Sequence, residues 1–330
     1  MLPALHARML AFLVLSCVTA KSVVEGKLIG AAVMPHGDFA YDPTLFERYA
    51  DYSPNATQQS RRLFDGSRRV GRWLASLKPD TIVLTTPHGL ETDWSLAIYS
   101  NSELKGEATV GRDLDESYAG GPHPTYTVES RAKGDLVVAK ALSVALSEAH
   151  GANSTSVIGW NDVIPLPLHW GEALPLRLMP DGDTAQLVVV GLPLSRHNYS
   201  SRVAPGFVEM GKVMGEVLES SPKRIALLVS TDLAHRHWPN TTMGFSPHSE
   251  PFDRAVGQWA ASLDRDSLLV ESTRWVDEVY SCGWLGICLL QGALDQVGTW
   301  LPRLEAGPEH PTYYGMLAAS FARVQSAAHR

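Results

Sequence analysis

Four short, largely continuous apolar runs stand out along the chain, and each is followed by a turn or loop. They are Lys27–Val33, Thr81–Thr86, Gln186–Leu192 and Arg224–Thr231. Continuous rather than alternating hydrophobicity is typical of strands that are buried on both faces, as in a sheet covered by helices. We therefore expect these segments to form the centre of such a sheet.

Longer stretches of helical character lie between and after these runs. They are Ser60–Leu77, Gly134–Ala149, Gly206–Glu219, Pro251–Leu263, Gly283–Val297 and Thr312–Ala327. Alternation of strands and helices predicts one α/β domain over residues 21–330, with a central, largely parallel or mixed sheet flanked by helices. The Gly/Pro-rich segment Ala119–Pro124 and the proline-rich segment Ile164–Pro180 are expected to be ordered loops that line a pocket.

The first twenty residues have the features of a secretory signal peptide. Residues 9–20 form an apolar run that is shorter than the ~20 residues needed to span a bilayer. The run ends at Val18-Thr19-Ala20, which predicts cleavage after Ala20. The alternative is a buried N-terminal strand or helix. We expect a protein of the secretory pathway or the extracellular space, and otherwise a cytoplasmic one. Glycosylation sequons begin at Asn55, Asn153, Asn198 and Asn240.

Composition and charge exclude several classes of protein. The 45% of hydrophobic residues and 19% of charged residues exclude a disordered chain. The net charge of −7, without a basic run, argues against a nucleic-acid partner. The three cysteines are too few for a disulfide scaffold, and no stable membrane span is expected. Without the signal peptide only Cys282 and Cys288 remain, and we expect both to be free thiols.

Histidines follow three of the four predicted strands. His36 and His88 each lie in a Pro-His-Gly turn, and His235 follows the last run in the segment Asp232–His237. Ligands of open α/β sheets bind beyond the carboxyl ends of the strands. If the strands are parallel, these three histidines converge on one crevice.

Such a cluster suits a divalent metal. Two neutral imidazoles and one anionic ligand form a facial site with open positions. The third ligand is expected in the segment Trp275–Leu294, where Cys282 precedes an apolar helix whose dipole favours a thiolate. Glu278, about one helical turn earlier, is the alternative ligand, and Cys282 then becomes a small core residue.

The sequence also contains the residue types of a hydrolytic triad. Ser230 or Ser281 with His235 and Asp232 would make a triad, but the chain has no Gly-x-Ser-x-Gly nucleophile turn. Phosphate-binding and dinucleotide-binding glycine motifs are likewise missing from the sequence.

The order of these motifs resembles the class III extradiol dioxygenase B-subunit superfamily, which includes the LigB-type ring-cleaving enzymes and the Memo proteins. The resemblance rests first on the turns at His36 and His88 and on Ser230–His235. It extends over about residues 27–327. Further matching segments are Gly121-Pro122, Leu168–Leu176, Cys282-Gly283 and Gln291–Leu294.

The resemblance implies a single α/β domain with a non-haem Fe(II) in the ring-cleaving branch. Copper or zinc is the alternative metal. It implies His36 and His88 as metal ligands. It also implies that His235, with Asp232 alongside, is the acid/base that handles the catecholic proton. His169 is expected to hydrogen-bond the substrate. His123 is expected either to do the same or to lie at the surface.

Two positions depart from the ring-cleaving enzymes. Those enzymes use a Glu as third ligand, where this chain has Ser281-Cys282-Gly283, as in the Memo branch. They also place a His directly before the glycine in the Leu168–Leu176 segment, where this chain has Trp170.

The sequence thus predicts a metal-dependent dioxygenase that cleaves a catechol-type ring with O2. The alternative is a Memo-like metal-binding or redox protein without ring cleavage. Iron with a carboxylate ligand would favour the enzyme, and copper with a thiolate would favour the alternative. The expected partners are a small catecholic substrate and O2, and a homodimer is an open possibility.

Overall fold

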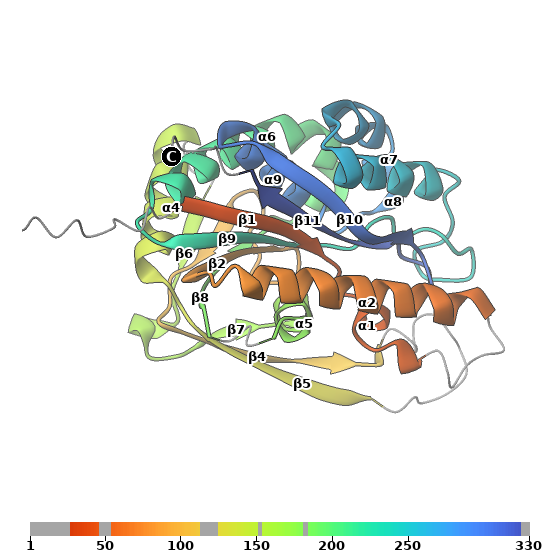
Figure 1. Cartoon of the computed structure of the whole chain (residues 1–330), viewed down its shortest axis with the longest axis horizontal. Helices are drawn as coiled ribbons and strands as arrows, with labels where there is room; N and C mark the ends of the chain where they lie inside the picture. Colours follow the sequence, from red (N-terminus) through yellow and green to blue (C-terminus); the bar gives the residue numbers. More distant parts are fainter. Residues whose placement is uncertain (1–26, 46–53, 113–124, 151–153, 181–183, 325–330) are drawn as a thin grey trace, which may run out of the picture.

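An eight-stranded mixed sheet forms the centre of the molecule (Figure 1). The computed structural model describes residues 27–45, 54–112, 125–150, 154–180 and 184–324. In spatial order the strands are β10 (Trp300–Glu309), β11 (Met316–Arg323), β1 (Lys27–Met34), β9 (Arg224–Ser230), β2 (Thr81–Thr86), β8 (Gln186–Gly191), β3 (Leu96–Tyr99) and β6 (Ser154–Val157).

The four strands predicted from the apolar runs are the four central ones. β1, β9, β2 and β8 pair in parallel, in that order. Their residues are almost all buried, because helices and a second sheet cover the two faces. The prediction of a mixed, helix-flanked sheet is therefore confirmed, and the antiparallel pairs lie towards its two ends.

Helices cover the sheet on both sides (Figure 1). α4 (Leu136–His150), α6 (Arg196–Ser220), α7 (Ser249–Ser262) and α9 (Trp284–Gln296) contribute to one large apolar core with the sheet. α2 (Pro54–Ser76) and α5 (Trp170–Leu178) pack on the opposite face. The short helices α1 (Asp38–Tyr41) and α8 (Val276–Val279) lie close to the site described below. Asp38 lines its cavity, and the carbonyl oxygen of Val279 accepts the backbone N–H of His235.

A three-stranded sheet completes the second face and forms one wall of the site. Its order is β5 (Tyr126–Lys133), β4 (Glu103–Val110) and β7 (Leu166–Leu168). Along β5 buried and exposed residues alternate, so one face of the small sheet packs inward and the other meets solvent. Among the described residues, no helix is long and apolar enough to cross a membrane.

Two predicted elements were wrong. Thr312–Ala327 was expected to be a helix, but it contains β11, which pairs with both β1 and β10. The helical propensity of its alanines is outweighed by two strand ladders and by burial on both faces. Ile164–Pro180 is not an irregular loop, because it contains β7 and α5. The predicted signal peptide and the Ala119–Pro124 segment lie outside the described residues, and the boundary at residue 21 stays a prediction.

Candidate metal centre

The turns after β1 and β2 bring His36 and His88 beside Cys282. One ligand atom of each residue lies within 4.8 Å of the other two, and no metal ion is present. The two imidazole rings meet edge to face, with centroids 4.7 Å apart. Nε2 of His36 lies 3.5 Å from Sγ of Cys282. The structure therefore brings together the three residues that the sequence named first as metal ligands.

A hydroxyl group sets the orientation of the His36 ring. Ser230 Oγ donates its proton to the carbonyl oxygen of Gly171, so it accepts a hydrogen bond from Nδ1–H of His36 at 2.8 Å. Nε2 therefore carries a lone pair. This nitrogen lies 3.3 Å from a carboxylate oxygen of Asp232. Two acceptors at this distance repel each other, and a metal ion held by Nε2 would relieve this repulsion, so the residues fit a metal ion.

Burial keeps both imidazoles in the neutral form that binds metals. It lowers the pKa of His36 to about 3, with smaller contributions from His235 and Arg196. It also lowers the pKa of His88 well below the ordinary value. The ring of His88 stacks on Trp170, with centroids 4.6 Å apart. Both rings are thus held in place, and no additional proton competes with a metal ion for their ring nitrogens.

Cys282 is held against the end of β9 by its neighbour. A side chain at Gly283 would come within 2.4 Å of Thr231 Oγ1, so only glycine allows this approach. The backbone N–H of Asp232 donates to Sγ of Cys282 at 3.3 Å. Burial raises the pKa of the Cys282 thiol, and the Asp232 carboxylate raises it further. A bound cation would lower the pKa of the thiol and stabilise the thiolate.

Glu278, the alternative third ligand, lies elsewhere. Its carboxylate accepts a hydrogen bond from Ser246 and pairs with His248 Nδ1 at 2.8 Å, and its side chain is 47% exposed. The prediction assumed one helix through positions 278 and 282. Instead α8 ends at Val279, and Tyr280 adopts a positive φ of 55° that redirects the chain. The second thiol, Cys288, is free and packs in the apolar core.

A cavity of about 600 Å³ opens in front of the cluster. His235 lines it together with His36, His88 and Asp232, so the third histidine turn also reaches the site. Nε2 of His235 is buried and has no hydrogen-bond partner among the described residues. Burial, with smaller contributions from His237 and His197, lowers the pKa of His235 to about 4. The imidazole is therefore neutral at pH 7.

The remaining walls of the cavity come from several separate segments. His169 caps α5 and lines the cavity, and its backbone N–H donates to Glu172 at 2.5 Å. Glu172 is fully buried, which raises its pKa to about 7. Tyr313 and Tyr314 add aromatic surface near His235. Sequence reasoning missed both tyrosines, because their segment was assigned to a helix.

Comparison with known proteins places the chain in a family. The model of the catalytic LigB subunit of aromatic ring-opening dioxygenase matches residues 41–322, which include His88, His235 and Cys282 but begin after His36. No curated protein matches the chain. The crystal structure of uncharacterized protein JW3007 from Escherichia coli K12 is similar at a TM-score of 0.50 and 14% identity, over 88% of this chain and 99% of that chain, which shows the fold alone. On the extent of the family match, the chain belongs to the LigB family of aromatic ring-opening dioxygenase catalytic subunits.

Proposed function

We propose that the protein is a non-haem metal dioxygenase that opens a catechol-type ring with O2, with His36, His88 and Cys282 holding Fe(II). The observation that carries the proposal is the position of His36 Nε2, which lies 3.5 Å from the Cys282 sulfur and 3.3 Å from the Asp232 carboxylate, beside a cavity that His36 and Asp232 line. Three protein ligands leave positions open towards that cavity for substrate and oxygen.

The chain's own residues supply binding and proton transfer. When bound, the metal would draw the catechol oxygens and O2 together and carry electron density between them. His235 is the base assigned to the catecholic proton, because it lines the cavity and its Nε2 has no other described partner. Asp232 lines the cavity beside His36, and its carboxylate would balance the positive charge of the metal.

The cavity suits a small aromatic molecule. Its volume of about 600 Å³ lies within the range of about 300–1,000 Å³ typical of small-molecule sites. Trp170, Tyr313 and Tyr314 provide flat apolar walls for a ring, and His169 offers a hydrogen-bonding edge. Aromatic walls with a few polar groups favour a planar ring that carries hydroxyl groups.

The thiol supports a second candidate function. A soft thiolate with two imidazoles is a preferred environment for copper or zinc, whereas the ring-cleaving enzymes use a carboxylate. On this alternative the protein binds copper in a Memo-like way, takes part in redox chemistry and does not open rings.

The test is anaerobic loading of the full chain with Fe(II), Cu(I) or Zn(II), followed by oxygen uptake with a panel of catechols. The proposed function predicts oxygen uptake by the Fe(II) protein that depends on the catechol, and its loss in Cys282→Ser. Cys288→Ser is the matched control, since it changes a second buried thiol that lies outside the cluster. Preferential binding of copper, with no catechol-dependent uptake in any metal form, would favour the second candidate.

A further inference from the structure

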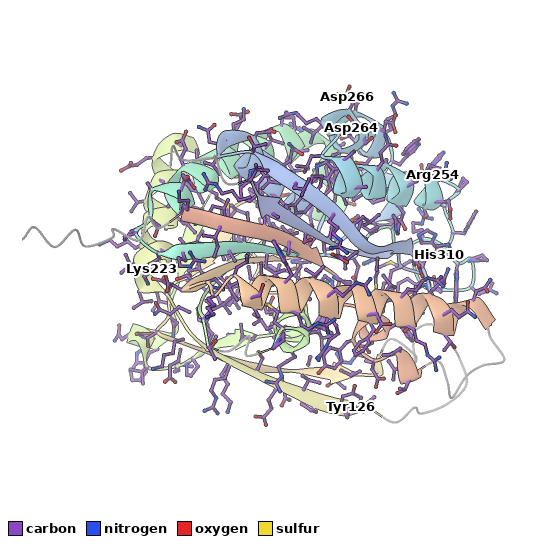
Figure 2. The ribbon with its side chains drawn as sticks, in the orientation of Figure 1. Tyr126, Lys223, Arg254, Asp264, Asp266 and His310 are labelled. Atoms are coloured by element: carbon purple, nitrogen blue, oxygen red, sulfur yellow. The ribbon has the colours of Figure 1, made fainter. Side chains whose placement is uncertain are left out.

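A second group of metal-ligating side chains lies outside the cavity of the first centre. It consists of His237, Glu250 and His310, with one ring nitrogen of each histidine and one carboxylate oxygen within 4.8 Å of one another. His237 follows β9, Glu250 lies in the first turn of α7, and His310 directly follows β10. Figure 2 shows His310 at the edge of the molecule, below Arg254 of α7.

A buried carboxylate is hydrogen-bonded to the ring of His237. Asp253 Oδ2 lies 2.8 Å from Nε2 of His237, and both side chains are about 95% buried. The other oxygen of Asp253 accepts the backbone N–H of Ala234 at 2.9 Å. A carboxylate on one ring nitrogen is the usual outer partner of a metal-binding histidine, because it fixes the tautomer that leaves the other nitrogen free.

His310 and Glu250 form the accessible side of the group. Nε2 of His310 lies 3.5 Å from a Glu250 oxygen, and both side chains are partly exposed. Nδ1 of His310 is buried and has no hydrogen-bond partner among the described residues. A cavity of about 130 Å³, lined by Glu250, Asp253, Arg254, Pro308 and His310, opens beside them. This space is large enough for an ion with a water ligand.

The two imidazoles stack face to face. Their centroids are 4.0 Å apart, and the planes differ by 4°. Lone pairs of parallel rings do not converge, so an ion would require one ring to tilt. His310 is the ring that can tilt, because it is partly exposed and borders the cavity. His237 is fixed by Asp253.

We propose that His237, Glu250 and His310 form a second metal site that takes Zn²⁺, with Asp253 as the outer partner of His237. Two imidazoles and a carboxylate, with water as the fourth ligand, are a donor set that zinc accepts in tetrahedral geometry. The site would join the segment after β9, the start of α7 and the end of β10. Because the segment after β9 also carries Asp232 and His235, bound zinc would stabilise the wall of the first centre.

One neighbour opposes the ion. Arg254 lines the same cavity, and the positive charge of its side chain opposes the binding of a cation there. Replacement of this charge should therefore strengthen zinc binding. This gain-of-affinity variant separates a true site from nonspecific binding to surface histidines.

The test is a titration of the metal-free full chain with Zn²⁺ against a chromophoric chelator, in a His36→Ala background that removes the first centre. We expect one equivalent of zinc to remain. Glu250→Gln and His310→Ala should each lower its affinity by more than about 100-fold, since loss of an outer partner alone costs about 10–100-fold. Arg254→Gln should raise the affinity, and zinc should raise the melting temperature of the background protein.

His248→Ala is the matched control. His248 is a partly exposed histidine that also pairs with a carboxylate, Glu278, but it belongs to neither group of ligands. His248→Ala should leave the affinity for the remaining equivalent of zinc unchanged. The proposal is overturned if the His36→Ala protein binds no zinc. It is also overturned if Glu250→Gln and His310→Ala change the affinity no more than His248→Ala does.

Discussion

Replacement of Ser230 by alanine tests how the first centre is built without replacing a metal ligand. Ser230 is fully buried, and its hydroxyl joins Nδ1–H of His36 to the carbonyl oxygen of Gly171. The variant removes this bridge and leaves a buried donor and a buried acceptor without their partner. The His36 ring also loses the contact that holds its proton on Nδ1.

The expected magnitudes follow from these two lost hydrogen bonds. An unsatisfied buried polar group costs about 1–3 kcal/mol, so Ser230→Ala should lower the free energy of unfolding by about 2–6 kcal/mol. Loss of an outer partner of a metal ligand lowers metal affinity by about 10–100-fold. Chelator competition measures the second quantity, and urea unfolding of the metal-free chain measures the first.

Ser281→Ala is the matched control for this experiment. Ser281 is also a buried serine of the site, but its hydroxyl donates to the backbone carbonyl of Asp232 at 3.1 Å and does not touch His36. This variant should lose a single hydrogen bond and keep its metal affinity. The account of the His36 tautomer would be refuted if Ser230→Ala bound metal as tightly as Ser281→Ala.

Four further predictions follow. His235→Ala should keep the metal and lose turnover by about 10²–10⁴-fold in steady-state assays, whereas loss of metal would make His235 a ligand. Cys282→Ser should weaken metal binding in a chelator titration and Glu278→Gln should not; the opposite pattern would show that the carboxylate is the ligand. The metal-free chain should lose stability in urea as the pH falls from about 6.5 towards 4, because the unfolded histidines take up protons that buried His36 and His235 cannot, and a flat profile would contradict their low pKa values. N-terminal sequencing of the native protein should find Lys21 first, with glycans on exposed sequons, and a retained Met1 would rule out the signal peptide.

The central strands and the histidine turns were predictable because both leave local signals. β1, β2, β8 and β9 are buried on both faces, so each appears as a continuous apolar run with nearly the predicted ends. Parallel pairing then determines that His36, His88 and His235 share one edge of the sheet.

The rest depends on long-range contacts that short sequence patterns do not carry. β11 is rich in alanine, which predicts a helix, but pairing with β1 and β10 keeps this segment extended. The choice between Cys282 and Glu278 depended on the turn at Tyr280, which no periodicity reveals. The contact of Ser230 with His36 spans 194 positions of the chain, so the sequence does not reveal that this hydroxyl orients a metal ligand.

The most direct test of the proposed function is the fate of the oxygen atoms. The Fe(II)-loaded chain would be given a catechol that supports oxygen uptake, under ¹⁸O₂, and the product would be analysed by mass spectrometry. A ring-opening dioxygenase inserts both atoms of O2 into one substrate, so we predict a ring-opened product that carries ¹⁸O in its new carboxylate. A quinone without ¹⁸O, formed together with labelled hydrogen peroxide, would contradict ring opening and leave a metal-dependent oxidase.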